Sequence, residues 1–110
     1  MSTSPVGQFQ QVLLLAILRQ GKTAFGLEVR TEIERCAHRT VSRGAFYTTL
    51  DRLVKKGILT WEEATPSDPA RTAPLRRFRV TPAGLEALRA SRRALQALWR
   101  GLDEILPEDA

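Results

Sequence analysis

The apolar positions between Val41 and Gly57 repeat with the period of an α-helix. Residues at spacings i, i+4, i+7 and i+8 share one side of such a helix and form its buried face. These residues are Phe46, Leu50, Leu53 and Val54. Ser42 is a favourable N-cap residue, and Gly57 provides a stop after two lysines. We therefore expect a short helix here, with one buried and one exposed face.

The first helix is expected from about Pro5, capped by Ser4, to Gln20, with Gly21 ending it. Its sequence FQQVLLLAILRQ is apolar almost all round after Gln11, which indicates that it is covered on more than one side. A chain of 110 residues cannot easily provide that cover alone. The pattern therefore predicts a partner subunit.

A second amphipathic helix is expected from Leu27 to about His38, with Leu27, Val29, Ile33 and either Cys36 or Ala37 on its apolar side. A brief segment, 39–41, joins it to the helix that Ser42 caps. Two helices joined by a short turn are typical of a helix-turn-helix.

After Gly57 the period changes from 3.6 to 2, which predicts two strands, Ile58–Glu63 and Leu75–Val80. The connection ATPSDPARTAP contains three prolines and predicts a hairpin with a long tip. Phe78 and Val80, together with Trp61 or Leu59, are expected to close over the core.

Thr81 and Pro82 open a last helix that we expect to continue to about Leu106. Its leucines recur every seven residues, and with no further chain to cover this stripe, pairing with a second copy is expected. Arg92 lies among these apolar positions and can mark a polar cavity, act as a register device or extend into solvent. The predicted dimer interface, which includes two residues of the first helix, consists of Val12, Leu15, Leu88, Leu95, Leu98, Trp99, Leu102 and Ile105.

The formal net charge of +5 is concentrated in residues 39–79, which contain nine cations and four acids, whereas the remainder is balanced. Such a segment is expected in a protein that binds phosphates. The single cysteine, Cys36, and the single histidine, His38, have no partner residues at a useful spacing and are expected to be structural. One cysteine also favours a reducing, cytoplasmic compartment.

The sequence offers no support for an enzyme, a membrane protein or a metal site. It contains no GxSxG motif, no paired acid and histidine set, no cysteine cluster and no phosphate-binding loop. The apolar run 12–18 is too short to span a bilayer. No cofactor is expected.

Small and hydrogen-bonding residues at the start of the helix after Ser42, with cations along it, are what a helix needs in the major groove of DNA. A solvated amphipathic helix is the simpler alternative, and a cross-strand ion pair of Arg77 or Arg79 with Glu62 or Glu63 is the alternative for the hairpin. The predicted contacts with double-stranded DNA are Ser42, Arg43, Gly44, Tyr47, Thr48, Arg52, Lys55, Arg71, Arg76 and Arg77.

The order of motifs resembles the PadR family of bacterial transcriptional regulators. The block GAFYTTLDRLVKKG is similar to the family's G-T-L-Y-x-x-L-x-x-L-x-x-x-G, and RRFRVTPAG is similar to its R-x-Y-x-L-T-x-x-G. Arg43 stands where the family has proline, Ala45 where it has threonine, Phe25 where it often has histidine and Leu75 where it has an arginine. Because Arg43 and Ala45 lie where bases would be contacted, the operator sequence cannot be carried over.

The resemblance implies a mainly α fold with a small β-hairpin wing: a winged helix-turn-helix over residues 1–81 and a C-terminal dimerisation helix and tail over residues 82–110. It implies a homodimeric repressor on a pseudo-palindromic operator. Some members of the shorter subfamily bind planar hydrophobic effectors beside a tryptophan of the last helix, a position that Trp99 matches loosely. A tryptophan that serves only packing is the simpler interpretation. A winged-helix protein-interaction module that does not read DNA is the alternative function.

Overall fold

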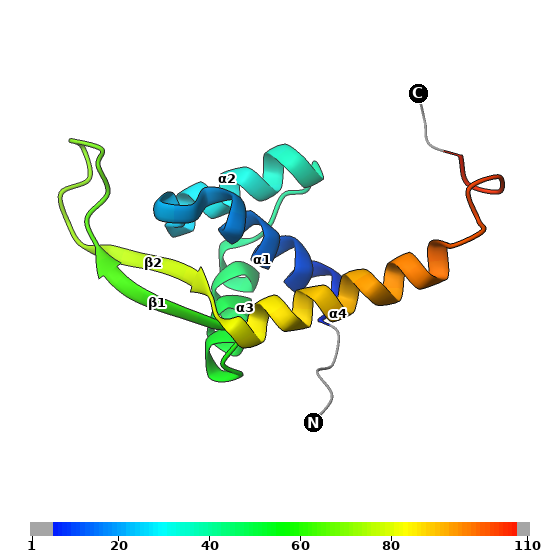
Figure 1. Ribbon diagram of the computed structural model, residues 1–110. Helices are drawn as coiled ribbons and strands as arrows, with labels where there is room; N and C mark the ends of the chain where they lie inside the picture. Colours follow the sequence, from blue (N-terminus) through cyan, green and yellow to red (C-terminus); the bar gives the residue numbers. More distant parts are fainter. Residues whose placement is uncertain (1–5, 108–110) are drawn as a thin grey trace.

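A computed structural model describes residues 6–107 of the chain and contains four α-helices and one antiparallel hairpin in this range (Figure 1). The predicted mainly α fold with a hairpin wing is confirmed. In chain order the elements are α1 Gln8–Gln20, the 3-10 turn η1 Gly21–Thr23, α2 Gly26–Ala37, α3 Arg43–Lys55, β1 Leu59–Ala64, β2 Leu75–Val80 and α4 Pro82–Trp99.

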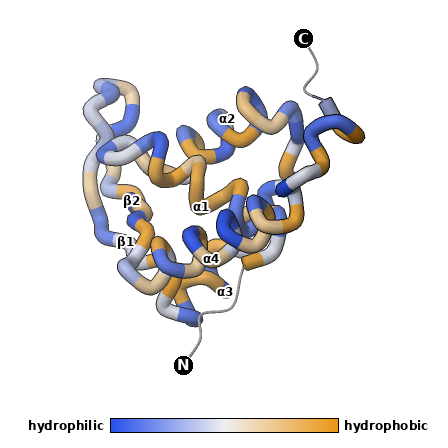
Figure 2. The backbone as a smooth tube through the Cα atoms, turned by 45° about the vertical axis from the view of Figure 1, so that its right-hand side comes forward, coloured by the Kyte–Doolittle hydropathy of each residue, from blue (hydrophilic) through white to orange (hydrophobic). Residues whose placement is uncertain are grey.

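The core lies where α1, α2 and α3 meet the base of the hairpin. Figure 2 shows hydrophobic residues along most of α1. The buried face of α1 packs against the apolar stripes of the other helices. On α3 the predicted buried face is confirmed, with Val54 partly buried at its edge. On α2 only part of the predicted apolar side is buried, because Leu27, Cys36 and Ala37 are exposed. The most deeply buried large side chains are Leu13, Leu14, Ile17, Val29, Ile33, Phe46, Leu50, Leu53 and Leu59.

Local capping signals set most helix ends. The Ser42 side chain accepts a hydrogen bond from the backbone N–H of Ala45 (3.2 Å), as the sequence predicted for the start of α3. Gly21 (φ 55°) and Gly57 (φ 75°) follow α1 and α3 in backbone conformations that suit glycine. The start of α1 differs from the prediction, because the helix begins at Gln8 after Gly7. The predicted cap and proline, residues 4 and 5, lie outside the described residues.

β2 is attached to the helical body by its backbone. The N–H of Phe78 donates to the carbonyl of Ala24 (2.9 Å), in the segment just before α2. β1 begins and ends one residue later than predicted and pairs with β2 along its whole length. Of the two candidates for closing the core, Leu59 is buried, whereas Trp61 is 37% exposed.

α4 starts at the hairpin base, runs beneath α1 and projects beyond the other helices (Figure 1). The Thr81 hydroxyl caps it by accepting from the N–H of Gly84 (3.1 Å). The predicted continuation to Leu106 is wrong, because α4 ends at Trp99. Arg100 leaves helical geometry (ψ 126°) and Gly101 takes a φ of 82°. Leu102 and Ile105 therefore lie in a turn after the helix and do not extend its heptad stripe. Among residues 6–107, no helix combines the length and apolar character needed to cross a bilayer.

Candidate nucleic-acid interface

The exposed face of α3 carries most of the residues predicted to contact DNA. Since Phe46, Leu50 and Leu53 face the core, residues on the opposite side of the helix must face solvent. Ser42, Arg43, Gly44, Thr48, Arg52 and Lys55 are all exposed. The cations Arg43, Arg52 and Lys55 have no ion-pair partner within residues 6–107. This face of α3 therefore presents uncompensated positive charge and small side chains to solvent.

A hollow of about 370 Å³ lies between the N-terminus of α2, the start of α3 and strand β2. Four of the predicted DNA contacts line it together, although they are far apart in the sequence: Arg43, Tyr47, Arg71 and Arg76. The Arg43 guanidinium lies 5.8 Å from the centroid of the Tyr47 ring. We call this feature the basic hollow.

Tyr47 is held in position by its neighbours. Its ring packs edge-to-face on Phe46, with centroids 5.1 Å apart and planes at 84°. Its hydroxyl oxygen lies only 2.5 Å from where a Cβ at residue 26 would be, so Gly26 leaves the space that this oxygen occupies. A fixed phenol at the mouth of a basic hollow suits hydrogen bonding to an anionic oxygen.

Arg76 and Arg77 point to opposite faces of the hairpin, since adjacent residues of a strand alternate. The Arg76 guanidinium lies 4.3 Å from the centroid of the Trp61 ring and 4.0 Å from the carboxylate of Asp51 on α3. Arg76 also lines the basic hollow. Trp61 was expected only as a core candidate. Its place diagonally across the strands from Arg76, on the same face, is the signal that could have identified this stacking.

Arg77 instead forms the cross-strand ion pair that the sequence left as an alternative. Its guanidinium donates to the Glu62 carboxylate (2.6 Å) and thereby lowers the pKa of Glu62. The two residues are direct partners in the strand register. Arg77 does not line the basic hollow.

Arg71, in the loop between the strands, is also paired. Its guanidinium forms an ion pair with Glu28 of α2 and lies 5.7 Å from the centroid of the Phe25 ring. Sequence reasoning did not identify Glu28, because the two residues are 43 positions apart and nothing in their local patterns relates them.

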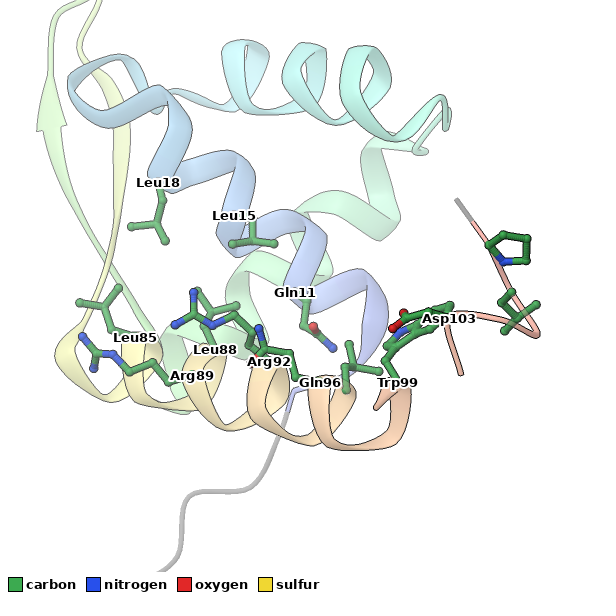
Figure 3. Close-up of a pocket in the computed structure, with 13 residues that line it drawn as sticks. Gln11, Leu15, Leu18, Leu85, Leu88, Arg89, Arg92, Gln96, Trp99 and Asp103 are labelled. Carbon is green, nitrogen blue, oxygen red and sulfur yellow. The ribbon is translucent and has the colours of Figure 1, made fainter. Parts of the chain in front are cut away.

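A second hollow, of about 870 Å³, lies between α1 and α4 (Figure 3). Leu15 and Leu18 point into it from α1, and Leu88 and Trp99 from α4. Several of the predicted dimer residues are exposed: Leu15, Leu95, Leu98, Trp99 and Ile105, whereas Val12, Leu88 and Leu102 are partly buried. An apolar surface along α1 and α4 is therefore left uncovered by residues 6–107.

Three helices followed by a hairpin that projects beside the third helix define a winged helix-turn-helix protein. The chain matches the PadR-like transcriptional regulator family over residues 14–90 and belongs to this family. The regulator Rv3488 of Mycobacterium tuberculosis is 41% identical over 75 residues, a match that covers 68% of this chain and 65% of that protein. The members of the family are transcriptional regulators, not enzymes.

Solved structures share the fold at low sequence identity. A PadR-like transcriptional regulator from Bacillus cereus superposes with a TM-score of 0.69 at 19% identity, covering 92% of this chain and 93% of that one. A transcriptional regulator from Thermoplasma acidophilum gives a TM-score of 0.65 at 18% identity, with coverages of 94% and 100%. At this identity the agreement extends to the fold alone.

Proposed function

We propose that this chain is a cytoplasmic, sequence-specific DNA-binding repressor that acts as a homodimer. The observation that supports this most strongly is the exposed face of α3, where Arg43, Arg52 and Lys55 have no ion-pair partners in residues 6–107. Arg43 also lines the basic hollow. A helix with this surface fits the major groove, while the hairpin arginines lie beside the sugar-phosphate backbone.

The residues of α3 divide into two roles by their place along the helix. Residues of its first turn and of the exposed stripe at positions 44, 48 and 52 lie closest to the base edges, and those beside the hairpin or beyond this stripe lie closest to phosphates. We assign Ser42, Arg43, Gly44, Thr48 and Arg52 to bases or adjacent phosphates, and Tyr47, Lys55 and Arg76 to the backbone. Arg77 is the weakest backbone candidate, because Glu62 already engages its guanidinium. A contact of Arg71 with the DNA backbone would compete with its ion pair to Glu28.

Selection of bound duplexes from a random pool, followed by footprinting, tests this assignment. Arg43→Ala should change the preferred sequence, because arginine can pair bidentately with guanine. Lys55→Ala should instead weaken binding to all duplexes alike and flatten the salt dependence by about one unit per subunit. An unchanged sequence preference in Arg43→Ala would remove Arg43 from the base-reading set.

The dimer places two copies of α3 in successive major grooves about 34 Å apart, so the selected site should be an imperfect palindrome. The apolar surface along α1 and α4 supports this, since a second copy would cover Leu15, Leu95 and Leu98. Within each subunit, residues 1–81 would bind DNA and residues 82–110 would join the subunits.

The interaction-module alternative makes a different prediction for the same protein. Titration of random duplex DNA at low and moderate salt separates the two functions, because a DNA-binding protein must bind non-specifically at low salt. No binding in dilute buffer would favour the interaction module.

We further propose that the hollow between α1 and α4 admits a small planar hydrophobic effector, with Trp99 as one wall. Trp99 is half exposed and lies beside apolar side chains in a volume of about 870 Å³, within the range of small-molecule sites. In a Trp61→Phe background Trp99 is the only tryptophan, so its fluorescence reports this site alone. Planar dyes should quench it and release the operator. Quenching without release would leave Trp99 as a packing residue.

A further inference from the structure

The loop between β1 and β2 is attached to the helical body by one side chain far from the hairpin base. Ten residues, 65–74, connect the strands. At the base, the Phe78 N–H donates to the Ala24 carbonyl (2.9 Å). In the loop, Arg71 forms an ion pair with Glu28 in the first turn of α2. The hairpin is therefore fixed to the segment just before α2 by a backbone hydrogen bond and to α2 itself by an ion pair.

The loop itself is shaped to direct Arg71 toward α2. The Asp68 side chain accepts from the N–H of Ala70 (2.9 Å), and the Asp68 carbonyl accepts from the N–H of Arg71 (3.0 Å). Such an Asp-initiated turn fixes the backbone next to Arg71. The Arg71 guanidinium is then held by the Glu28 carboxylate and the face of the Phe25 ring.

Burial distinguishes Arg71 from Arg76, the other hairpin arginine that lines the basic hollow. The Arg71 side chain is 21% exposed and its Glu28 partner 29%, whereas the Arg76 side chain is 54% exposed. The second carboxylate oxygen of Glu28 is buried and has no hydrogen-bond partner within residues 6–107. Without Arg71, Glu28 would lose its ion-pair partner, a costly change for a partly buried carboxylate.

We propose that Glu28 and Arg71 are positioning residues that hold the hairpin loop against α2 and thereby fix the angle at which the wing meets DNA. This replaces the phosphate contact that the sequence predicted for Arg71, and it rests on the DNA-binding function proposed above. Substitution of Glu28 best distinguishes a positioning role of Arg71 from a phosphate contact, because Glu28 is an acid beside the basic hollow. If Arg71 bound phosphate, Glu28 would compete with DNA for it, and neutralising Glu28 would strengthen binding.

The two roles predict opposite changes in operator affinity for Glu28→Gln. As a positioning residue, its replacement should weaken operator binding about fivefold, the order expected for a charge-assisted hydrogen bond that orders a loop. Arg71→Ala should weaken binding by a similar factor with an unchanged salt slope, because no phosphate contact is lost. Lys55→Ala is the matched control, and it should flatten the slope by about two units per dimer.

Charge reversal provides a rescue that a phosphate contact could not show. Glu28→Arg and Arg71→Glu should each weaken binding, and the double variant should bind more tightly than either single variant, since the ion pair is restored in reverse. A glutamate at position 71 cannot bind phosphate, so recovery would exclude direct contact. Recovery should be incomplete, because a cation in the first turn of α2 opposes the helix dipole.

The experiment measures fluorescence anisotropy of a labelled operator duplex with the full chain and these variants at several salt concentrations. Thermal unfolding by circular dichroism establishes that each variant is folded. Hydrogen exchange of the amides of residues 65–74, without DNA, should show faster exchange in Glu28→Gln than in the wild type. Tighter or unchanged binding in Glu28→Gln, a flatter slope in Arg71→Ala, or absence of rescue would each overturn the proposal. If the wild type bound no duplex, the proposed function would have failed, and exchange would still show whether the pair holds the loop.

Discussion

Gly84, the third residue of α4, allows this helix to approach the start of the hairpin. A Cβ at this position would overlap the carbonyl oxygen of Ile58 and lie 2.7 Å from Cγ1 of Val80, where ordinary contact begins at 3.4 Å. The Ile58 carbonyl cannot easily move, because it accepts from both the N–H (3.0 Å) and the hydroxyl (2.9 Å) of Thr81. We therefore predict that Gly84→Ala destabilises the fold.

The magnitude follows from three contributions. Overpacking against a fixed carbonyl costs about 1–3 kcal/mol. Displacement of α4 weakens the cap in which the Gly84 N–H donates to Thr81, a further loss of about 1 kcal/mol. Alanine is about 1 kcal/mol more favourable than glycine inside a helix, which offsets part of this loss. The free energy of unfolding should fall by about 1–3 kcal/mol, which lowers the melting temperature by roughly 5–15 °C.

Thermal unfolding followed by circular dichroism at a fixed protein concentration measures this loss, because dimerisation would make the melting temperature depend on concentration. Gly44→Ala is the matched control, since a Cβ at that helical glycine meets nothing within 4 Å. A melting temperature of Gly84→Ala equal to or above that of the wild type would refute the close approach of α4 to the carbonyl of Ile58.

Three further predictions concern other parts of the chain. Gly44→Ala should raise stability by up to about 1 kcal/mol, yet weaken operator binding in anisotropy titrations, because the added methyl group lies on the side of α3 that is proposed to face DNA. Hydrogen bonds from Cys36 and Arg35 lower the pKa of Glu32 from 4.5 to about 2. The stability that Glu32 contributes is therefore fully present above pH 4.5 and is lost as the pH falls toward 2. In urea unfolding, the free energy of unfolding should depend less on pH in Glu32→Gln than in the wild type. His38 ends α2 at a φ of 50°, and His38→Gly should raise the urea midpoint, with a gain of about 0.5–1 kcal/mol, because glycine adopts the left-handed conformation without strain. An unchanged or lower midpoint would contradict this.

Periodicity and capping residues were sufficient to predict the helices and the hairpin, because these signals act over a few neighbouring residues. The cap of α3 at Ser42 and the stop at Gly57 are examples. The end of α4 was predicted wrongly because the heptad leucines continue past Gly101. Periodicity alone predicted a continuous helix, whereas Gly101 adopts a positive φ just after the helix ends.

The candidate site was only partly predictable. The exposed face of α3 follows from helix geometry, whereas the pairing of Arg71 with Glu28 depends on a contact across 43 residues. The division of Arg76 and Arg77 between opposite hairpin faces follows from strand alternation. The partner of each depends on the strand register, which places Glu62 opposite Arg77.

The early end of α4 changes what the proposed dimer requires. An 18-residue helix holds little more than two heptads, fewer than the three or four that a coiled coil usually needs. The dimer interface therefore needs more apolar surface than α4 provides, and we expect α1 to supply it. Leu15 of α1 is 50% exposed and faces α4 across the larger hollow (Figure 3). We predict that α1 and α4 contribute jointly to the interface.

Leu15→Asp should then separate the subunits as effectively as Leu95→Asp on α4. Each should raise the dissociation constant at least about 100-fold, because a symmetric interface carries the change twice and the loss of one buried leucine costs about 2–5 kcal/mol. Sedimentation velocity over a range of concentrations measures this. Leu27→Asp is the matched control, since Leu27 is 58% exposed on α2 and does not line the hollow between α1 and α4. If Leu15→Asp remained dimeric while Leu95→Asp dissociated, α4 alone would hold the subunits together and the joint interface would be wrong.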